Sequence, residues 1–151
     1  MKKISKITIK RIPDNDCDLS WIGTFSNEAG PLAIKHDGGS RSYPYFNSAN
    51  ATSKREAQQD YDRMMQFENG NVSMYGVRAE AETLTSQDGK TWKIDAITSG
   101  GLWGLESDND EKYFTEEEDN QLDDLTITLK EYGFTAEEIA AAPIIRTGFN
   151  S

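Results

Sequence analysis

The chain has 151 residues, a formal net charge of −10 at pH 7 and a single cysteine. Apolar residues make up 36% of the chain, which together with its 15 aromatic side chains excludes wholesale disorder. Cys17 alone excludes an internal disulfide, and no apolar run approaches the roughly 18 residues that span a membrane. We therefore expect one cytoplasmic domain, with neither a signal peptide nor a membrane anchor.

The first third of the chain predicts two strands and a long loop. Residues 4–12 alternate imperfectly between apolar and polar side chains, and residues 19–25 form a short apolar run. The Asp-rich segment 14–18 predicts a turn, so we expect the two strands to form a hairpin. Residues 26–52 are mostly polar and predict a long loop. Its aromatic residues are expected to keep it partly ordered: Tyr43, Tyr45 and Phe46.

The middle of the chain predicts a helix followed by a β-hairpin. Ser53 can cap a helix that ends at Asn69-Gly70, with Glu56 completing a capping box. Residues 72–85 alternate as a long strand, and residues 92–98 form its partner. The Asp88-Gly89 pair between them is typical of a tight turn.

The segment 92–106 holds two of the three tryptophans and is expected to organise the fold. It begins as a strand, breaks at Gly100-Gly101 and resumes as an apolar run through Trp103. A glycine pair inside an apolar segment indicates a bulge, a bend or the close approach of another backbone. Trp103 is expected in the core.

The last third predicts two helices and a tail. Thr115 is the expected cap of the first helix, whose buried stripe is Leu122, Leu125, Leu129 and Tyr132. Thr135 begins a short helix that Pro143 ends, and residues 144–151 are either an edge strand or a frayed end. The order ββαββαα predicts an α+β fold: an antiparallel sheet of about four strands with helices on one side.

The negative charge is concentrated in residues 105–151. Residues 1–104 contain 13 acidic and 13 basic residues, whereas residues 105–151 contain 13 acidic and 3 basic residues. This excess has two interpretations: a solvated surface that keeps the protein soluble, or a surface that binds a basic partner. Rows of carboxylates on a helix resemble nucleic-acid phosphates and could occupy a basic nucleic-acid channel.

The partner hypothesis describes a non-enzymatic protein that binds a basic, nucleic-acid-binding protein and does not itself bind nucleic acid or membrane. Its predicted binding residues are the acids on and before the second long helix: Glu106, Asp108, Asp110, Glu111, Glu116, Glu117, Asp119, Asp123 and Asp124.

The alternative hypothesis is a small-ligand or peptide-binding module. Its binding site would lie between the aromatic loop and the glycine bend, with the Trp103 ring as the platform on which the ligand stacks. Its predicted residues are Tyr43, Tyr45, Phe46, Gly100, Gly101 and Trp103.

No sequence motif predicts catalysis, a metal site or a cofactor. Asp14-x-Asp16-x-Asp18 matches the opening of a calcium-binding EF-hand loop, but the glycine and the bidentate glutamate that such a loop needs are missing. His36 and Cys17 are each alone in type, so a zinc site is not expected. An enzyme using His36 with a nearby carboxylate ranks last, because no second catalytic group is identifiable.

The segment Ser99-Gly-Gly-Leu-Trp-Gly-Leu-Glu-Ser-Asp108 resembles one found in small uncharacterised proteins of bacteria and their mobile elements. The resemblance covers ten residues and carries over no catalytic residue. It implies a bacterial, phage or plasmid origin, a setting in which small acidic proteins often inhibit restriction or CRISPR systems.

Overall fold

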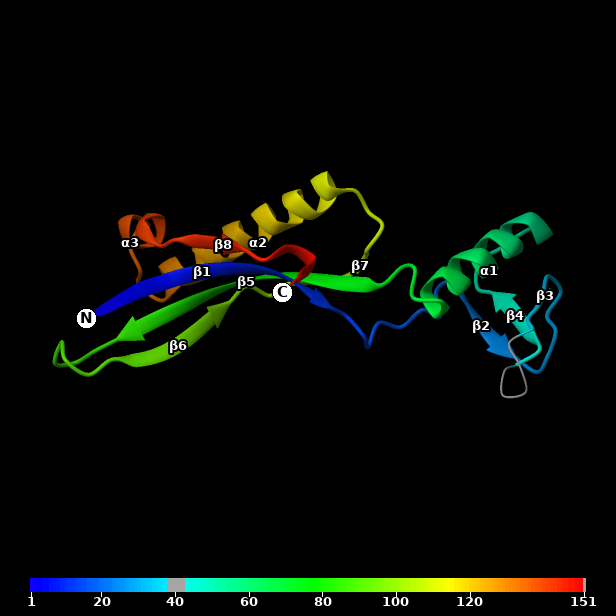
Figure 1. Cartoon of the computed structure of the whole chain (residues 1–151), viewed down its shortest axis with the longest axis horizontal. Helices are drawn as coiled ribbons and strands as arrows, with labels where there is room; N and C mark the ends of the chain where they lie inside the picture. Colours follow the sequence, from blue (N-terminus) through cyan, green and yellow to red (C-terminus); the bar gives the residue numbers. More distant parts are fainter. Residues whose placement is uncertain (38–42, 151) are drawn as a thin grey trace. The chain divides into compact units, whose positions relative to one another are not determined.

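The computed structural model describes residues 1–37 and 43–150, which fold as two compact units (Figure 1). The sheet unit consists of Met1–Asn15 and Met74–Ser151, and the inserted unit is Asp16–Ser73. The single domain expected from chain length therefore consists of two units, one inserted in the sequence of the other. No helix among the described residues is long and apolar enough to cross a membrane.

The sheet unit is built on a five-stranded sheet in which β5 is central. β5 pairs with β1 on one edge and with β6 and then β7 on the other, all antiparallel, and β8 adds to β1 in parallel. The strands are β1 (Lys2–Pro13), β5 (Met74–Thr85), β6 (Lys93–Thr98), β7 (Leu102–Glu106) and β8 (Ile144–Arg146). The helices of this unit are α2 (Glu111–Glu131), α3 (Ala136–Ala141) and the 3-10 turn η1 (Gly148–Asn150).

The two helices α2 and α3 pack on one side of the sheet and seal its core (Figure 1). Alternate residues of β1 and β5 face the helices, since strand side chains alternate between the faces. The fully buried core side chains are Ile7, Ile9, Val77, Ala79, Ala81, Phe114, Leu125 and Leu129. The other side of β1 and β5 is polar, where Glu80 lies 3.7 Å from Lys10 and 3.8 Å from Arg78.

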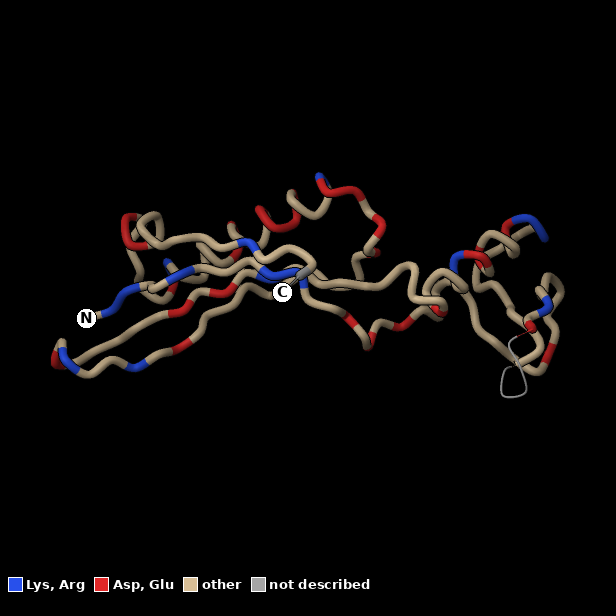
Figure 2. Tube along the Cα trace, in the orientation of Figure 1, with Lys and Arg blue, Asp and Glu red and all other residues tan. Residues whose placement is uncertain are grey.

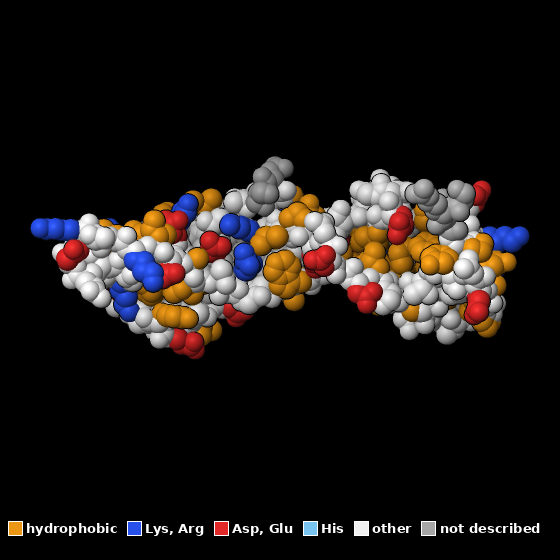
Figure 3. All heavy atoms as spheres, turned by 90° about the horizontal axis from the view of Figure 1, so that it is seen from below, with side chains coloured by type: hydrophobic (Ala, Val, Ile, Leu, Met, Phe, Trp, Pro, Cys, Tyr) orange, Lys and Arg blue, Asp and Glu red, His pale blue; other side chains and the backbone are white. Residues whose placement is uncertain are grey.

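On the face of the sheet unit seen in Figure 3, acidic and basic side chains are interspersed with hydrophobic ones.

The inserted unit is a small three-stranded antiparallel sheet with one helix. Its elements are β2 (Gly23–Ser26), β3 (Ile34–Lys35), β4 (Tyr45–Ser48) and α1 (Lys54–Glu68), with β4 central. Its core consists of Ile22, Ile34, Phe46, Ala57 and Met64. The helix begins as predicted, since Ser53 accepts a hydrogen bond from the Glu56 backbone N–H at 3.2 Å. The Glu56 carboxylate in turn accepts hydrogen bonds from the backbone N–H and the hydroxyl of Thr52, both at 2.7 Å.

The α+β class is confirmed, with helices on one side of a five-stranded sheet that is antiparallel except for the β1–β8 pair. The predicted β5–β6 hairpin is also confirmed, with Gly89 at a φ of 73° in its turn. The first two strands do not form the expected hairpin, because β1 pairs with β5 and β8 while β2 pairs with β4.

The expected loop 26–52 holds two strands, because the buried Phe46 ring gives β4 a core to pack into. Residues 38–42 of that loop lie outside the described residues.

Candidate functional site

The cap of helix α2 lies five residues earlier than expected, at Asp110 instead of Thr115, and this changes the roles of the first acids of the helix. Asp110 is the N-cap and accepts a hydrogen bond from the Tyr113 backbone N–H at 2.8 Å. Thr115 lies inside the helix, where its hydroxyl donates to the Glu111 carbonyl at 2.9 Å. The predicted Thr115 cap is therefore wrong, because Asp110 satisfies the free N–H groups one turn earlier.

Glu111 forms a bidentate ion pair with Arg11 of β1. The two guanidinium nitrogens donate to the two carboxylate oxygens at 3.0 and 2.5 Å. The Arg11 hydrogen bond lowers the pKa of Glu111 below its ordinary value. The same hydrogen bond is the largest cause that raises the pKa of Arg11. Glu111 therefore connects the start of α2 to β1. Its carboxylate binds Arg11 and not a partner protein.

Glu118 extends this ion pair into the core. Its Oε1 lies 3.1 Å from Arg11 Nη2 and 3.6 Å from Arg146 Nη1 of β8. The Arg11 guanidinium lies 4.9 Å from the Phe114 ring centre and 4.6 Å from that of Phe149, within range of cation–π contact. Burial of Glu118 was not predicted from the sequence. The signal was present, since Glu118 is four residues after Phe114 and falls on the buried stripe.

Gln121 fastens the middle of α2 to the glycine bend. Its Oε1 accepts hydrogen bonds from Ser99 Oγ at 2.7 Å and from the Gly101 backbone N–H at 2.9 Å. Ser99 Oγ also accepts from the Ala79 backbone N–H of β5 at 3.0 Å. The predicted break at Gly100-Gly101 is therefore a bend between β6 and β7, held by a helix side chain that the sequence did not single out.

Figure 2 shows acidic residues spread along α2, and those that remain are exposed or half-buried. Asp119 is held by Arg146 at 2.7 Å. The outer acids are the four α2 residues of the predicted partner surface that neither cap the helix nor bind an arginine among the described residues: Glu116, Glu117, Asp123 and Asp124. Glu116 is 4.0 Å from the exposed Lys112, and Glu117 accepts a 3.4 Å hydrogen bond from Asn120.

Two acids of the predicted surface precede the helix. Glu106 ends β7, pairs in register with Met74, and accepts hydrogen bonds at its carbonyl from Asn109. Asp108 is exposed in the loop between β7 and α2. The predicted acids are thus near one another in the chain, but several of them hold the fold together.

The residues of the alternative ligand site come from both units. Tyr43, Tyr45 and Phe46 belong to the inserted unit, where Phe46 is fully buried. The bend and Trp103 belong to the sheet unit. Trp103 is 44% exposed, so its predicted core position is wrong. The Trp103 ring covers Gly76 of β5, on the face of the sheet opposite α2. A side chain at position 76 would overlap this ring.

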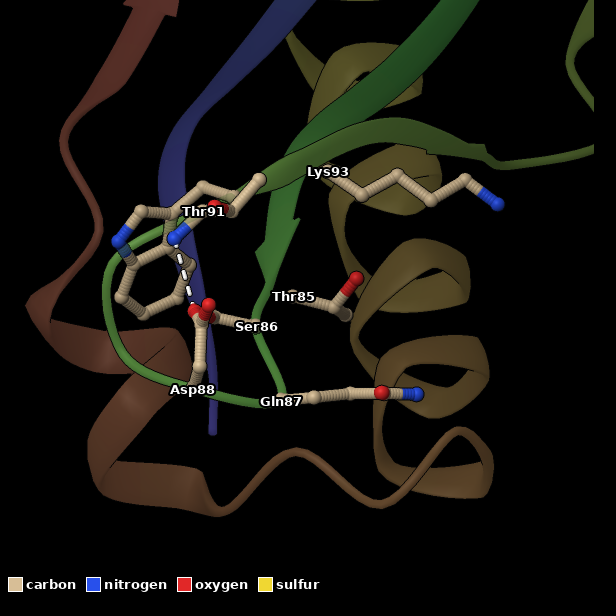
Figure 4. A pocket seen from close by; sticks show the side chains of 7 residues that line it. Thr85, Ser86, Gln87, Asp88, Thr91 and Lys93 are labelled. Atoms are coloured by element: carbon tan, nitrogen blue, oxygen red, sulfur yellow. Dashed lines mark hydrogen bonds between the residues drawn. The ribbon is translucent and has the colours of Figure 1, made fainter.

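A surface hollow of about 430 Å³ lies at the turn between β5 and β6 (Figure 4). Asp88 is turned into this loop, and its Oδ1 accepts backbone hydrogen bonds from Lys90 and Thr91, both at 2.8 Å. The Thr91 bond is the largest cause of a lowered pKa for Asp88. The carboxylate therefore stays ionised and shapes the turn. The hollow is lined by Thr85, Ser86, Gln87, Asp88, Thr91, Trp92 and Lys93.

His36 lies among aromatic side chains of the inserted unit. His36 Nδ1 lies 3.0 Å from the Tyr61 hydroxyl, and its ring packs 4.6 Å from that of Phe25. Within residues 1–37 and 43–150, no three His, Cys, Asp or Glu side chains are grouped so that they could hold a metal ion.

Comparison with protein-family models found no matching model, and comparisons with curated proteins and with solved structures found no match.

Proposed function

We propose that this is a non-enzymatic interaction protein whose outer acids on α2 bind a basic surface of a partner protein. The observation that carries the proposal is that the acids of α2 fall into two groups, one bound within the sheet unit and one facing outward. Glu111 and Glu118 bind arginines of the sheet unit, while Glu116, Glu117, Asp123 and Asp124 remain at the outer surface.

The outer acids are supported by a helix fixed at two points. Arg11 binds its first turns and Ser99 its middle, through Gln121. A partner would therefore meet carboxylates whose backbone is already ordered, which reduces the entropy cost of binding. Charge on such a surface mainly raises the association rate and the specificity.

The outer acids form two pairs, each with a spacing of seven residues. Glu116 and Asp123 form one pair, and Glu117 and Asp124 the other. Seven helical residues rise about 10.5 Å, roughly the axial rise of three phosphates on one DNA strand. This spacing supports the finer proposal of a nucleic-acid mimic. In a phage or other mobile element, such a mimic would inhibit a host restriction or CRISPR protein by occupying its nucleic-acid channel.

A pull-down from bacterial lysate with the immobilised full chain tests the proposal. The test variant carries E116Q, E117Q, D123N and D124N. The matched control removes the same number of negative charges from the inserted unit, at the exposed residues Glu28, Asp37, Asp62 and Glu68.

We expect a basic nucleic-acid-binding protein to be retained by the wild type and the control, released as salt rises, and largely lost by the test variant. Double-stranded DNA added in excess should compete. Retention that is equal in both variants, or insensitive to salt, would contradict the proposal.

A further inference from the structure

Strand β6 forms an open edge of the five-stranded sheet. β5 is paired on its inner side, and none of the described residues pairs with the outer side of β6. Five of its six residues are exposed, including Ile94 at 66%. An open strand presents a row of unpaired N–H and C=O groups and is a template for pairing with another strand.

The outward backbone groups of β6 can be assigned from the hydrogen bond at its end. The Ser99 backbone N–H donates to the Ala79 carbonyl at 2.9 Å, so the groups of Ser99 point toward β5. Backbone groups alternate in direction along an antiparallel strand. The N–H and C=O groups of Ile94, Ala96 and Thr98 therefore point outward.

Only some registers allow two copies of β6 to pair about a two-fold axis perpendicular to the sheet. A register centred on Lys93 places two lysines opposite each other, and one centred on Asp95 places two aspartates opposite each other. Centring on Ala96 sets Asp95 against Ile97. Centring on Ile94 sets Lys93 against Asp95 of the other copy, twice.

The register centred on Ile94 also satisfies the backbone. Ile94 of each copy would donate to and accept from Ile94 of the other, since these groups point outward. Lys93 and Asp95 would then form non-hydrogen-bonded pairs, the positions at which opposing side chains come closest. In the single chain these two residues lie 3.8 Å apart, and both side chains are largely exposed. Figure 4 shows Lys93 extending away from the turn.

We propose that a second copy of this chain docks on β6, antiparallel and centred on Ile94, so that the two sheets become continuous. The reciprocal Lys93–Asp95 pairs fix the register, and the backbone hydrogen bonds of Ile94 and Ala96 hold the strands together. This inference concerns the β6 edge and is independent of the proposed role of α2.

Charge variants distinguish loss of pairing from loss of fold, because a second charge change can restore pairing but would not restore a misfolded chain. K93D sets acidic side chains against each other in the homodimer, and D95K does the same with basic ones. Each variant alone should be monomeric in sedimentation velocity at low salt, whereas the wild type should dimerise with rising concentration. An equimolar mixture of K93D and D95K should form a heterodimer, and the double variant K93D/D95K should again form a homodimer.

A backbone variant and a matched control complete the test. I94P removes an outward N–H and no intrachain sheet bond, so it should leave circular dichroism unchanged and abolish dimerisation. K112D makes the same charge change on α2 and should remain dimeric. A wild type that is monomeric up to its solubility limit would overturn the proposal. So would K93D and D95K that stay monomeric when mixed, or an I94P variant that is folded and still dimeric.

Discussion

Glu118 of α2 accepts a hydrogen bond from Arg11 of β1 at 3.1 Å, and only 2% of Glu118 is exposed. Breaking a buried ion pair from one side leaves an uncompensated charge and costs about 3–5 kcal/mol. We predict that Glu118→Ala lowers the free energy of unfolding by about 3 kcal/mol. This value is at the lower end of the range because Arg11 still pairs with Glu111 in the variant. Urea denaturation measures this loss.

The matched control is Glu116→Ala, which removes an exposed carboxylate from the same helix. Its nearest cation is Lys112 at 4.0 Å, and exposed pairs contribute roughly 0–1 kcal/mol. Equal losses for the two variants would show that the buried position of Glu118 is energetically unimportant.

The Arg11–Glu111 pair predicts a specific dependence of stability on pH. The pKa of Glu111 is lower in the folded chain, so its contribution is present above its ordinary value of 4.5 and is lost as pH falls through the lowered folded pKa. We predict that Glu111→Gln is less stable than the wild type at pH 7. The two stability curves, from urea denaturation at several pH values, should converge below about pH 4.5. A constant difference at all pH values would exclude ionisation of Glu111 as the cause.

Local signals in the sequence predicted the parts of the fold that depend on neighbouring residues. Asp88-Gly89 identified the β5–β6 hairpin, and the cap of α3 was found from Thr135, whose capping box with Glu138 is present. The parallel addition of β8 could not be predicted, because Ile144 pairs with Ile7 across nearly the whole chain. Which strand pairs with one so distant in sequence depends on the core that the two strands share.

The candidate surface was predicted only in outline for a related reason. The acidic composition of α2 identified this helix as the candidate surface, but composition does not show which carboxylates pair with an arginine. Arg11 and Arg146 reach α2 from opposite ends of the chain and occupy Glu111, Glu118 and Asp119. Only three-dimensional contacts separate these acids from those at the outer surface.

Trp103 rests on Gly76, and this contact leads to a matched pair of glycine substitutions. A Cβ atom at Gly76 would overlap the Trp103 ring, whereas a Cβ atom at Gly100 meets no atom within 4 Å. We predict that Gly76→Ala costs about 1–3 kcal/mol by forcing Trp103 aside, while Gly100→Ala is nearly neutral. Thermal unfolding measures the cost, and a red shift of tryptophan emission would report displacement of the ring. Gly76→Ala with unchanged stability and emission would contradict the close packing of these residues.

The inserted unit leaves and re-enters the sheet unit at adjacent points, because Pro13 pairs in register with Tyr75 and the Asp14 N–H donates to the Met74 carbonyl at 2.9 Å. Without the insert, β1 and β5 would be a plain hairpin. We predict that replacing residues 15–73 by Asn-Gly, the preferred two-residue hairpin turn, leaves the sheet unit folded. Closing a shorter loop costs less entropy, so cooperative unfolding should persist. Amide NMR spectra should retain the dispersed signals of β1 and β5. Collapse of that dispersion would show that the sheet unit needs the insert to fold.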